Sequence, residues 1–553
     1  MRFIASFLSN KEGSIKKDIT FLILLFGIAF FQCLGRMPLF EPDEGRYAEI
    51  SREMLERGDF ITPFLNYVKY FEKPPLLYWL NALSFTLFGQ NEFAARFPGA
   101  LMGLLTVLLT YHIGRKLFRR PAGLLAALIL GTSTGFLLQA RLDITDMILT
   151  CTLSAALAFF FLAAREGEPR KTLYYHLFYL CAALAILAKG MIGIVFPAAI
   201  IFFYLLIFKR WRILGEMRPL TGIPLFLLVA APWFIVVSLR NPEFARFFFI
   251  HEHIERFLTK IHGHYKPFWY FIPVLAGTML PWSFFIPAAM KGVWKERLSS
   301  EGESRLYLAL WALLIFLFFS KSDSKLIPYI LPIFPPLALL MGSAFASMAD
   351  TIAKPMKTSG YIIAVILTLL GLGGICYPFI ATHPNLSAAP CIVIGGIFLC
   401  EGVITFINAF LGSLHNLLVG MVLCSYIVGI ASPALVLSEI AEKKSLKEMG
   451  MIVRERVGGK AVVSSFGLLQ GFSFYAERRV VIVGFRGETE FGSNQGDQSG
   501  WFIDMPRFIR LWDSPTKVFT LLSKGEFASF HGLVQNTPQV VAQTSKYLLI
   551  TNH

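Results

Sequence analysis

The chain is a succession of long apolar runs, and this constrains its fold more than any motif does. Of its 553 residues, 55% are hydrophobic and only 16% are charged, which is not the composition of a soluble domain. An apolar run of about 20 residues can cross a bilayer as a helix. We expect thirteen such spans, at residues 19–38, 97–114, 121–140, 147–164, 173–188, 191–208, 220–239, 267–290, 304–320, 326–347, 359–381, 389–411 and 415–436. The sequence therefore predicts a polytopic α-helical membrane protein.

Two apolar segments need separate treatment. The first span, 19–38, is followed by no small-x-small cleavage site, so we expect an uncleaved anchor rather than a signal peptide. Residues 74–89 are apolar, but the run is short and opens with Pro-Pro. We expect it to lie flat on the outer leaflet as an interfacial helix.

The distribution of Lys and Arg fixes the expected topology. The formal net charge is +15, and most of the excess lies in short loops between spans, so it indicates orientation and not a nucleic-acid partner. The basic loops are 115–120, 165–171, 209–218, 291–305 and 354–357. The alternating loops near 141–146 and 382–388 are almost free of Lys and Arg. We therefore expect the N-terminus in the cytoplasm and residues 39–96, 141–146, 240–266 and 437–553 on the opposite, periplasmic side. If 74–89 crossed the membrane, every later loop would violate this rule.

We expect two domains. Residues 1–436 would form the transmembrane domain, with outer loops at 39–96 and 240–266. Residues 437–553 would form a C-terminal α/β domain, because strand-like runs alternate there with helical patterns. The strand-like runs are 461–466, 480–483, 517–522 and 545–551, and the helical ones are 444–456 and 502–512. The seven cysteines all lie in apolar spans without C-x-x-C spacing, which is typical of small buried hydrophobic residues.

Polar residues of unusual density collect on the outer side. The segment 39–79 contains Glu41, Asp43 and Glu44, then Arg46 and Tyr47, and later Glu72 and Lys73. The other outer or boundary residues of this kind are Arg141, Asp143, Asp146, Lys189, His251, Glu252, His253, Arg256, Lys321, Asp323, Lys325 and Tyr329. Ionisable residues at a membrane boundary are by default functional candidates. Cations and carboxylates that converge on one face can build an anion site beside acids.

Each of these residues also has an ordinary structural explanation. Asp43 and Glu44 can stabilise the start of a helix over 44–57, because acids favour helix N-termini. Asp146 can begin the following span, and Lys189 can extend from a helix end toward water. Glu72 and Lys73 can form a surface ion pair of little energetic weight. His251 and His253 can be exposed loop residues or, with Glu252, metal ligands.

Several motifs resemble a known family. EPDEGRYAE (41–49), YFEKPPLLYW (70–79), ARLDITD (140–146), LAKGMIG (187–193), EHIERF (252–257) and KLIPYILP (325–332) resemble the GT-C membrane glycosyltransferases that use polyprenyl-phosphate sugars. Their order and spacing are most similar to those of the bacterial 4-amino-4-deoxy-L-arabinose lipid A transferases. Protein O-mannosyltransferases and oligosaccharyltransferases are more distant relatives. In the tail, GETEFG (487–492) resembles an acidic element near that family's site.

The resemblance implies a role for particular residues. It implies Asp43 and Asp146 as the catalytic acids. It implies substrate contacts, with Lys73 on the lipid phosphate, for Glu44, Arg46, Tyr47, Glu72, Lys73, Lys189, His251, Arg256, Tyr329 and Glu490. It also suggests a divalent metal ion with Glu72 and His251 as ligands.

The expected reaction follows from the same resemblance. The chain would transfer 4-amino-4-deoxy-L-arabinose from undecaprenyl phosphate to a phosphate of lipid A, at the periplasmic face of the bacterial inner membrane. We expect inversion by direct displacement, because no residue stands out as a covalent nucleophile. One alternative is a transferase that acts on a protein or on another glycan or lipid. Another is a flippase for a lipid-linked sugar, although the ionisable residues lie at one boundary and not at mid-span, where transport sites usually lie. A third is a membrane-anchored binding protein, which would leave the charged outer loops unexplained.

Overall fold

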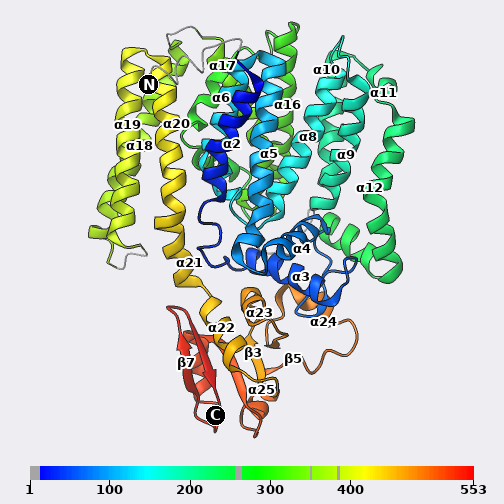
Figure 1. Ribbon diagram of the computed structural model, residues 1–553, viewed down its shortest axis with the longest axis vertical. Helices are drawn as coiled ribbons and strands as arrows, with labels where there is room; N and C mark the ends of the chain where they lie inside the picture. The colour runs from blue at the N-terminus through cyan, green and yellow to red at the C-terminus, as the bar shows by residue number, and fades with distance from the viewer. Residues whose placement is uncertain (1–12, 256–264, 349–351, 383–385) are drawn as a thin grey trace. The chain divides into compact units, whose positions relative to one another are not determined.

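The computed structural model describes residues 13–255, 265–348, 352–382 and 386–553. The chain divides into two compact units (Figure 1). We call Met1–Gln32 with Gly99–Val436 the helical unit, and Cys33–Pro98 with Leu437–His553 the mixed unit.

In the part that the structure describes, the helical unit consists of helices and their connections, with one isolated β-bridge between Tyr265 and Ser324. Its long helices are α2 (Ile15–Phe31), α5 (Glu92–Phe118), α8 (Thr145–Ala164), α9 (Lys171–Lys189), α10 (Ile192–Phe208), α12 (Pro219–Arg240), α16 (Ser300–Lys321), α18 (Lys354–Ile380), α19 (Ala388–Leu411) and α20 (Leu414–Ser432). The shorter ones are α6 (Arg120–Thr132), α7 (Thr134–Gln139), α11 (Ile213–Glu216), the π-helix η1 (Arg246–Glu255), α14 (Phe271–Thr278), η2 (Ser283–Phe285), α15 (Ile286–Met290), η3 (Ile327–Ile333), α17 (Phe334–Ala346) and η4 (Pro433–Leu437). α5 begins in the mixed unit and continues into the helical one.

Each predicted span overlaps a helix or a helix pair, but the predicted number of thirteen is not confirmed. Within the described ranges, nine helices are long and apolar enough to cross a membrane, or ten if one bent pair counts as a span. That pair, α14 with the helix at Ser283–Met290, bends by 114°. The predicted span 121–140 is broken into α6 and α7, and the spans at 19–38 and 191–208 correspond to helices of 17 residues each.

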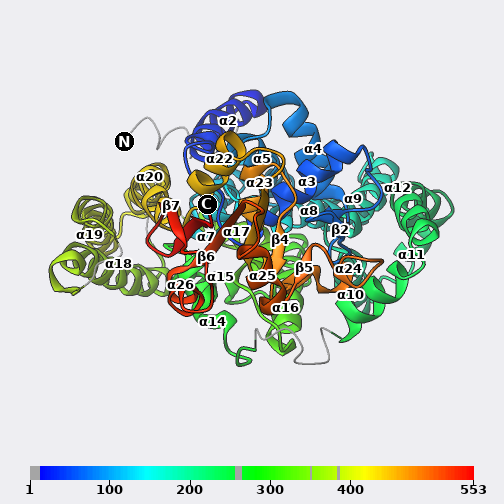
Figure 2. The same cartoon turned by 90° about the horizontal axis from the view of Figure 1, so that it is seen from below.

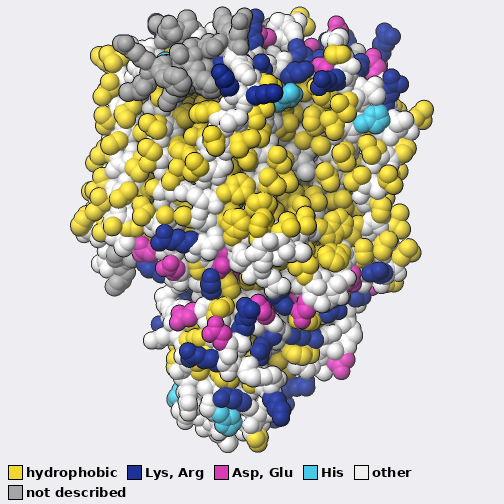
Figure 3. Space-filling view, viewed as in Figure 1, with side chains coloured by type: hydrophobic (Ala, Val, Ile, Leu, Met, Phe, Trp, Pro, Cys, Tyr) yellow, Lys and Arg dark blue, Asp and Glu magenta, His cyan; other side chains and the backbone are white. Residues whose placement is uncertain are grey.

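The outer surface of the helical unit has the character of a membrane protein. Hydrophobic side chains cover the visible face of its helices, and Lys and Arg gather at the end near α10 and α11 (Figure 3). Exposed apolar residues such as Leu220, Leu228 and Leu239 on α12 would be costly in water. In lipid the same residues carry no such cost, so the hydrocarbon is the natural solvent of this surface.

A buried ion pair joins two elements of the helical unit. Asp18 of α2 and Arg120 of α6 are almost fully buried. Arg120 donates from Nη2 to Asp18 Oδ1 at 2.6 Å and from Nε to Oδ2 at 2.8 Å. Tyr111 of α5 also donates to Asp18 Oδ2, at 2.5 Å. Three helices therefore meet at one carboxylate.

The mixed unit contains the first outer segment and the tail. From residues 33–98 it has α3 (Asp43–Arg57), the hairpin β1 (Phe64–Leu65) and β2 (Val68–Lys69), and α4 (Leu76–Phe88). From the tail it has α21 (Ser438–Lys444), α22 (Lys447–Arg456), β3 (Val462–Phe466), α23 (Gln470–Ala476), β4 (Val481–Val483), η5 (Gly487–Thr489), α24 (Glu490–Ser493), β5 (Phe502–Ile503), α25 (Met505–Trp512), β6 (Val518–Ser523), α26 (Lys524–His531), β7 (Gln539–Gln543) and β8 (Tyr547–Thr551).

The tail forms a three-layer α/β structure around one sheet. Its six strands lie in the order β5-β4-β3-β6-β8-β7 (Figure 2). β5, β4, β3 and β6 are parallel, whereas β8 and β7 are antiparallel additions at one edge. Alternate strand residues face opposite sides. One face packs on α22 and α23 through Met449 and Phe472, and the other packs on α25 and α26 through Phe508 and Phe530.

The predicted α/β tail is confirmed, and each predicted strand is present. The sequence missed β5, which has only two residues, and β7, whose side chains are mostly exposed. It also missed α23 and α26, which are shorter than most helices that a periodic pattern can reveal.

The compact units differ from the predicted division at residues 436/437 in one respect. Residues 33–98, expected in the membrane domain, belong to the same unit as the tail. The side chain of Asn66 connects this segment to the tail, because its amide makes two hydrogen bonds with the backbone of Val480, next to β4. Its Nδ2 donates to the Val480 carbonyl at 2.8 Å, and its Oδ1 accepts from the Val480 N–H at 2.9 Å.

The Asp18–Arg120 pair generates a stability prediction. Asp18→Asn should lower the free energy of unfolding by about 3–5 kcal/mol, because it leaves Arg120 as an uncompensated buried charge. Thermal unfolding in detergent would measure the loss. The double variant Asp18→Leu with Arg120→Met removes both charges and should recover most of the stability. A single variant that unfolds at the parental temperature would contradict this account.

Candidate functional site

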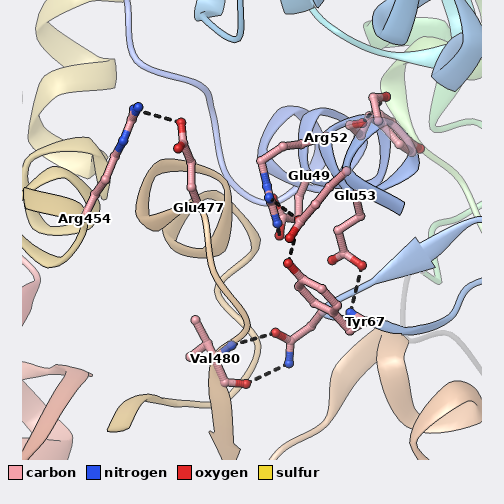
Figure 4. Close-up of polar contacts among 11 residues, drawn as sticks. Glu49, Arg52, Glu53, Tyr67, Arg454, Glu477 and Val480 are labelled. Atoms are coloured by element: carbon pink, nitrogen blue, oxygen red, sulfur yellow. Dashed lines mark hydrogen bonds and ion pairs between the residues drawn. The ribbon is translucent and has the colours of Figure 1, made fainter. Parts of the chain in front are cut away.

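Helix α3 buries the charged side chains of Glu44, Arg46, Glu49, Arg52 and Glu53. Its sequence, DEGRYAEISREMLER, places acids in the first turn and Arg57 in the last, and Gly58 ends it at φ +63°. Arg52 donates to both oxygens of the buried Glu49, at 2.7 and 2.9 Å (Figure 4). Burial, together with the charge of Glu49, raises the pKa of Glu53 well above its usual value, and Glu53 accepts the Tyr67 N–H at 2.9 Å. Such charges remain buried only because they are paired, hydrogen-bonded or neutral.

Arg96 fixes the path of the chain into α3. Its guanidinium is fully buried and donates to both carboxylate oxygens of Glu44, at 2.7 and 2.8 Å. It also donates to the carbonyls of Leu34, Met37 and Pro38, at 2.6–2.7 Å. Both oxygens of Glu44 are therefore engaged inside the protein. This favours the helix-start role of Glu44 over the substrate contact that the resemblance implies.

Two linked ion pairs begin at Asp43, the first residue of α3. Arg46 pairs with Asp43 on its own helix and with Glu488 of η5 in the tail. Its guanidinium also lies 4.8 Å from the ring centroid of Tyr47. Arg46 is buried, whereas 54% of the Asp43 side chain is exposed. A substrate can therefore reach the Asp43 carboxylate, and the ion pair with the buried Arg46 fixes the position of that carboxylate.

The tail meets α3 through the carboxyl ends of its parallel strands. β3 leads into Gln470 and Gly471, and β4 leads into Glu488. Gln470 Nε2 donates to Glu488 Oε2 at 3.3 Å, and the Gly471 N–H donates to Glu41 Oε1 at 2.8 Å. β4, the next strand in sequence, lies on one side of β3, and β6 lies on its other side. In α/β sheets, ligands bind at this edge, where the strand order reverses.

The E-K-P-P element lies in the same unit. The Tyr47 ring packs against Tyr78 of α4, with centroids 6.1 Å apart. Tyr70 OH donates to Glu72 Oε2 at 3.2 Å, and Lys73 Nζ donates to the Glu72 carbonyl at 3.1 Å. Lys73 is half-buried, and its ammonium carries a positive charge and three donors.

The helical unit brings together three other predicted residues. Asp146 in the first turn of α8 pairs with Lys189 at the last residue of α9. Lys189 Nζ also lies 4.7 Å from the ring centroid of Tyr329 in η3. The Tyr329 ring is tilted against that of Phe319, with centroids 5.1 Å apart. The Asp146 and Lys189 side chains are each about 90% buried. The predicted convergence of Asp146, Lys189 and Tyr329 is therefore present.

The remaining predicted residues have less support. His251 Nδ1 lies 2.8 Å from Glu255 Oε2 within η1, and Arg256 lies outside the described residues. Glu490 is exposed at the start of α24, and the acid of the GETEFG motif that reaches Arg46 is Glu488, two positions earlier.

The divalent metal at Glu72 and His251 stays a prediction. Within the described ranges, no group of three or more His, Cys, Asp or Glu residues could hold a metal ion.

Sequence reasoning missed four residues around the acid cluster. They are the anchoring Arg96, the acid Glu488, and Gln470 and Gly471 of the strand-end loop. Glu488 lies in a motif that had been singled out, and Arg96 is a charge at the edge of an apolar span. Gln470 and Gly471 carry no signal in the sequence, because their importance depends on contacts in the fold, with Glu488 for Gln470 and with Glu41, 430 positions away, for Gly471.

Comparison with known proteins agrees with this architecture. Residues 72–236 match the model of the dolichyl-phosphate-mannose-protein mannosyltransferase family, and residues 450–552 match that of the aminoarabinose transferase C-terminal domain. An undecaprenyl phosphate-alpha-4-amino-4-deoxy-L-arabinose arabinosyl transferase from Pectobacterium carotovorum is 32% identical over 90% of each chain. A protein of the same name from Aeromonas hydrophila is 32% identical over 88% of this chain and 90% of that one. The chain belongs to this arabinosyl transferase family.

Solved structures show the same fold. ArnT from Cupriavidus metallidurans, in a crystal structure bound to undecaprenyl phosphate, is 25% identical, with a TM-score of 0.85 over 98% of this chain and 99% of that one. An Archaeoglobus fulgidus oligosaccharyltransferase shares the fold alone, at 12% identity and a TM-score of 0.52 over 95% of this chain and 72% of that one. The expected GT-C glycosyltransferase fold and multi-pass membrane character are thus confirmed.

The GETEFG motif offers a matched pair of variants. Glu488→Gln should lower sugar transfer at least about tenfold, because it removes a charge-assisted hydrogen bond to buried Arg46, worth about 1.5–3 kcal/mol. Glu490→Gln changes an exposed side chain in the same motif and should leave transfer near the parental rate. Rates measured in membranes with matched protein levels would decide. The reverse order of effects would return the site role to Glu490.

Proposed function

We propose that the chain transfers 4-amino-4-deoxy-L-arabinose from undecaprenyl phosphate to a phosphate of lipid A, at the periplasmic face of the bacterial inner membrane. One observation carries the proposal. The relatives that match nine-tenths of this chain are named for the transfer of this sugar from undecaprenyl phosphate. The ion-paired acids of α3 and α8 suit a cationic amino sugar, which supports the same assignment.

The donor sets the first requirement of the site. Its carrier lipid has too much hydrocarbon to leave the bilayer, so its phosphate stays at headgroup level. We assign a phosphate contact to Lys73, which would stabilise the charge that develops on the departing undecaprenyl phosphate. Within the helical unit, Asp146 holds the Lys189 ammonium in an ion pair beside Tyr329. Lys189, Tyr329 and Arg256 stay predicted substrate contacts.

The acids have a different task. A phosphate of lipid A is already ionised, so the acceptor needs no general base. Asp43, half-exposed and oriented by Arg46, would hold the ammonium of the amino sugar and orient the ring. An acceptor phosphate oxygen then bonds to the anomeric carbon as the bond from that carbon to the carrier phosphate breaks. The bonding electrons leave with undecaprenyl phosphate, no proton moves, and the anomeric configuration inverts.

The orientation in the membrane completes the proposal. The end of the helical unit that is rich in Lys and Arg (Figure 3) would face the cytoplasm by the positive-inside rule. The opposite helix ends carry Asp146, Lys189 and Tyr329, because α8 begins where α9 ends. The site would then face the periplasm, where it meets the lipid A that has already crossed the inner membrane.

The acids provide the direct test. Asp43→Asn and Asp146→Asn should each lower transfer at least about a hundredfold, because each removes a charge that orients substrate or cation in the transition state. Both proteins should remain folded in the membrane. Mass spectrometry of lipid A from cells with and without each variant would show the added amino sugar or its loss. Normal modification by both variants would refute the assigned roles, and a sugar found on protein instead would refute the proposed acceptor.

The carrier phosphate provides a second test. Lys73→Ala should weaken binding of polyprenyl phosphate at least about tenfold, because a half-buried phosphate without its cation carries a desolvation penalty. Lys73→Arg should restore only part of the affinity, since a planar fork does not reproduce a compact ammonium. Lys69→Ala, four residues earlier on β2, is the matched control. If Lys73→Ala binds the lipid as tightly as the parent, Lys73 only anchors α4.

A further inference from the structure

Glu41 is an acid of the EPDEGRYAE motif that the proposed chemistry does not use. Its Oε1 accepts the Gly471 N–H at 2.8 Å, across 430 positions of sequence. Its Oε2 is shielded from solvent and has no hydrogen-bond partner. A buried carboxyl oxygen without a partner costs free energy, so its presence at this point calls for an explanation.

The contact with Gly471 depends on two glycines. A Cβ at Gly471 would lie 1.9 Å from Glu41 Oε1, and a Cβ at Gly45 would lie 2.6 Å from the Gly471 nitrogen. A side chain at Gly45 would displace the α23 backbone, and a side chain at Gly471 would displace the Glu41 carboxyl group from the peptide N–H. The sequence therefore permits the backbones of α3 and α23 to approach closely enough for Glu41 to reach the peptide N–H.

The contact closes a ring of interactions within the mixed unit. Gln470 follows β3 and donates to Glu488, Glu488 pairs with Arg46, and Arg46 pairs with Asp43. Asp43 is two residues from Glu41, and Gln470 adjoins Gly471. We call these residues the acid ring: Glu41, Asp43, Arg46, Gln470 and Glu488. A displacement of Glu41 would move the strand-end loop and, through Glu488, the guanidinium that orients Asp43.

The ring also holds a complementary pair of unsatisfied atoms. Arg46 Nε is buried and has no acceptor, and Glu41 Oε2 is buried and has no donor. Burial raises the pKa of Glu41 to about 8; the Gly471 hydrogen bond and Arg46 oppose the shift, and Asp43 and Glu44 add to it. At neutral pH Glu41 is therefore the uncharged member of a cluster whose other acids are ion-paired.

We propose that Glu41 is a positioning residue: in its neutral form it clasps Gly471 and leaves Arg46 free to hold Asp43 and Glu488 in the arrangement that transfer requires. Once ionised, Glu41 competes with Asp43 for the single guanidinium. Asp43, Glu44 and Arg46 face it from α3, and Gln470 and Glu488 adjoin its contact on the tail. The inference rests on the proposed function, because it assigns Glu41 a part in that reaction.

The test compares pH–rate profiles between pH 6 and 9.5. The parent should lose kcat as pH rises through about 8, while KM for the donor changes little, since Arg46 is withdrawn from the acid it orients. Glu41→Gln keeps an acceptor for Gly471 and cannot ionise. It should retain kcat at pH 7 within about twofold and lose the alkaline decline. Glu448→Gln, an exposed acid on α22, should keep the parental profile.

Removal of the acceptor separates positioning from titration. Glu41→Leu cannot accept the hydrogen bond from the Gly471 N–H, so kcat should fall at least about tenfold at every pH, with KM for the donor within about threefold of the parental value. Unchanged kcat in Glu41→Leu, or the same alkaline decline in Glu41→Gln as in the parent, would overturn the role of Glu41 alone. No transfer by the parent would overturn the proposed function and this inference with it.

Stability gives a readout that is independent of activity. The folded pKa of Glu41 lies above its ordinary value of 4.5, so the folded state binds more protons than the unfolded state between about pH 4.5 and 8. Stability contributed at this site is therefore lost as pH rises through that window. The melting temperature of Glu41→Gln, followed by tryptophan fluorescence, should gain on that of the parent from pH 5 to pH 8. A constant difference would overturn the inference.

Discussion

The buried guanidinium of Arg96 is the interaction on which the outer segment depends. A charge that is closed off from water must find full compensation inside the protein, and Arg96 finds it in Glu44 and three backbone carbonyls. Those acceptors belong to one stretch of chain, residues 34–44, so that stretch has a single path. The path ends at the first turn of α3. The positions of Asp43 and Arg46 follow from where that turn begins.

The acid ring makes the tail part of the site and not an appendage to it. α3 buries most of its charged side chains, and the tail supplies the partner of one of them, because Glu488 pairs with Arg46. The Val480 peptide also satisfies the Asn66 amide. A truncated chain without residues 437–553 would leave Arg46 without Glu488. The tail therefore contributes to the electrostatics of α3.

The sequence predicted what depends on local pattern. Hydropathy located the helices, and the alternation of Lys and Arg in the loops placed Asp146, Lys189 and Tyr329 at one end of them, which the structure confirms by their contacts. It missed the break at Ser133 between α6 and α7, because both sides are apolar. It also assigned residues 33–98 to the transmembrane domain, because apolar spans flank them in the chain. The pairing of Asn66 with Val480 across 414 positions leaves no trace in local composition.

The two candidate acids share one electrostatic design. Asp43 is held by Arg46, and Asp146 is held by Lys189, each within its own compact unit. An ion-paired carboxylate accepts hydrogen bonds and donates none. Such acids are suited to hold cationic groups. A reaction whose acceptor is already ionised has no proton to remove, so the enzyme can use its carboxylates for orientation alone. The pairing of each acid with a cation is thus what the proposed displacement requires.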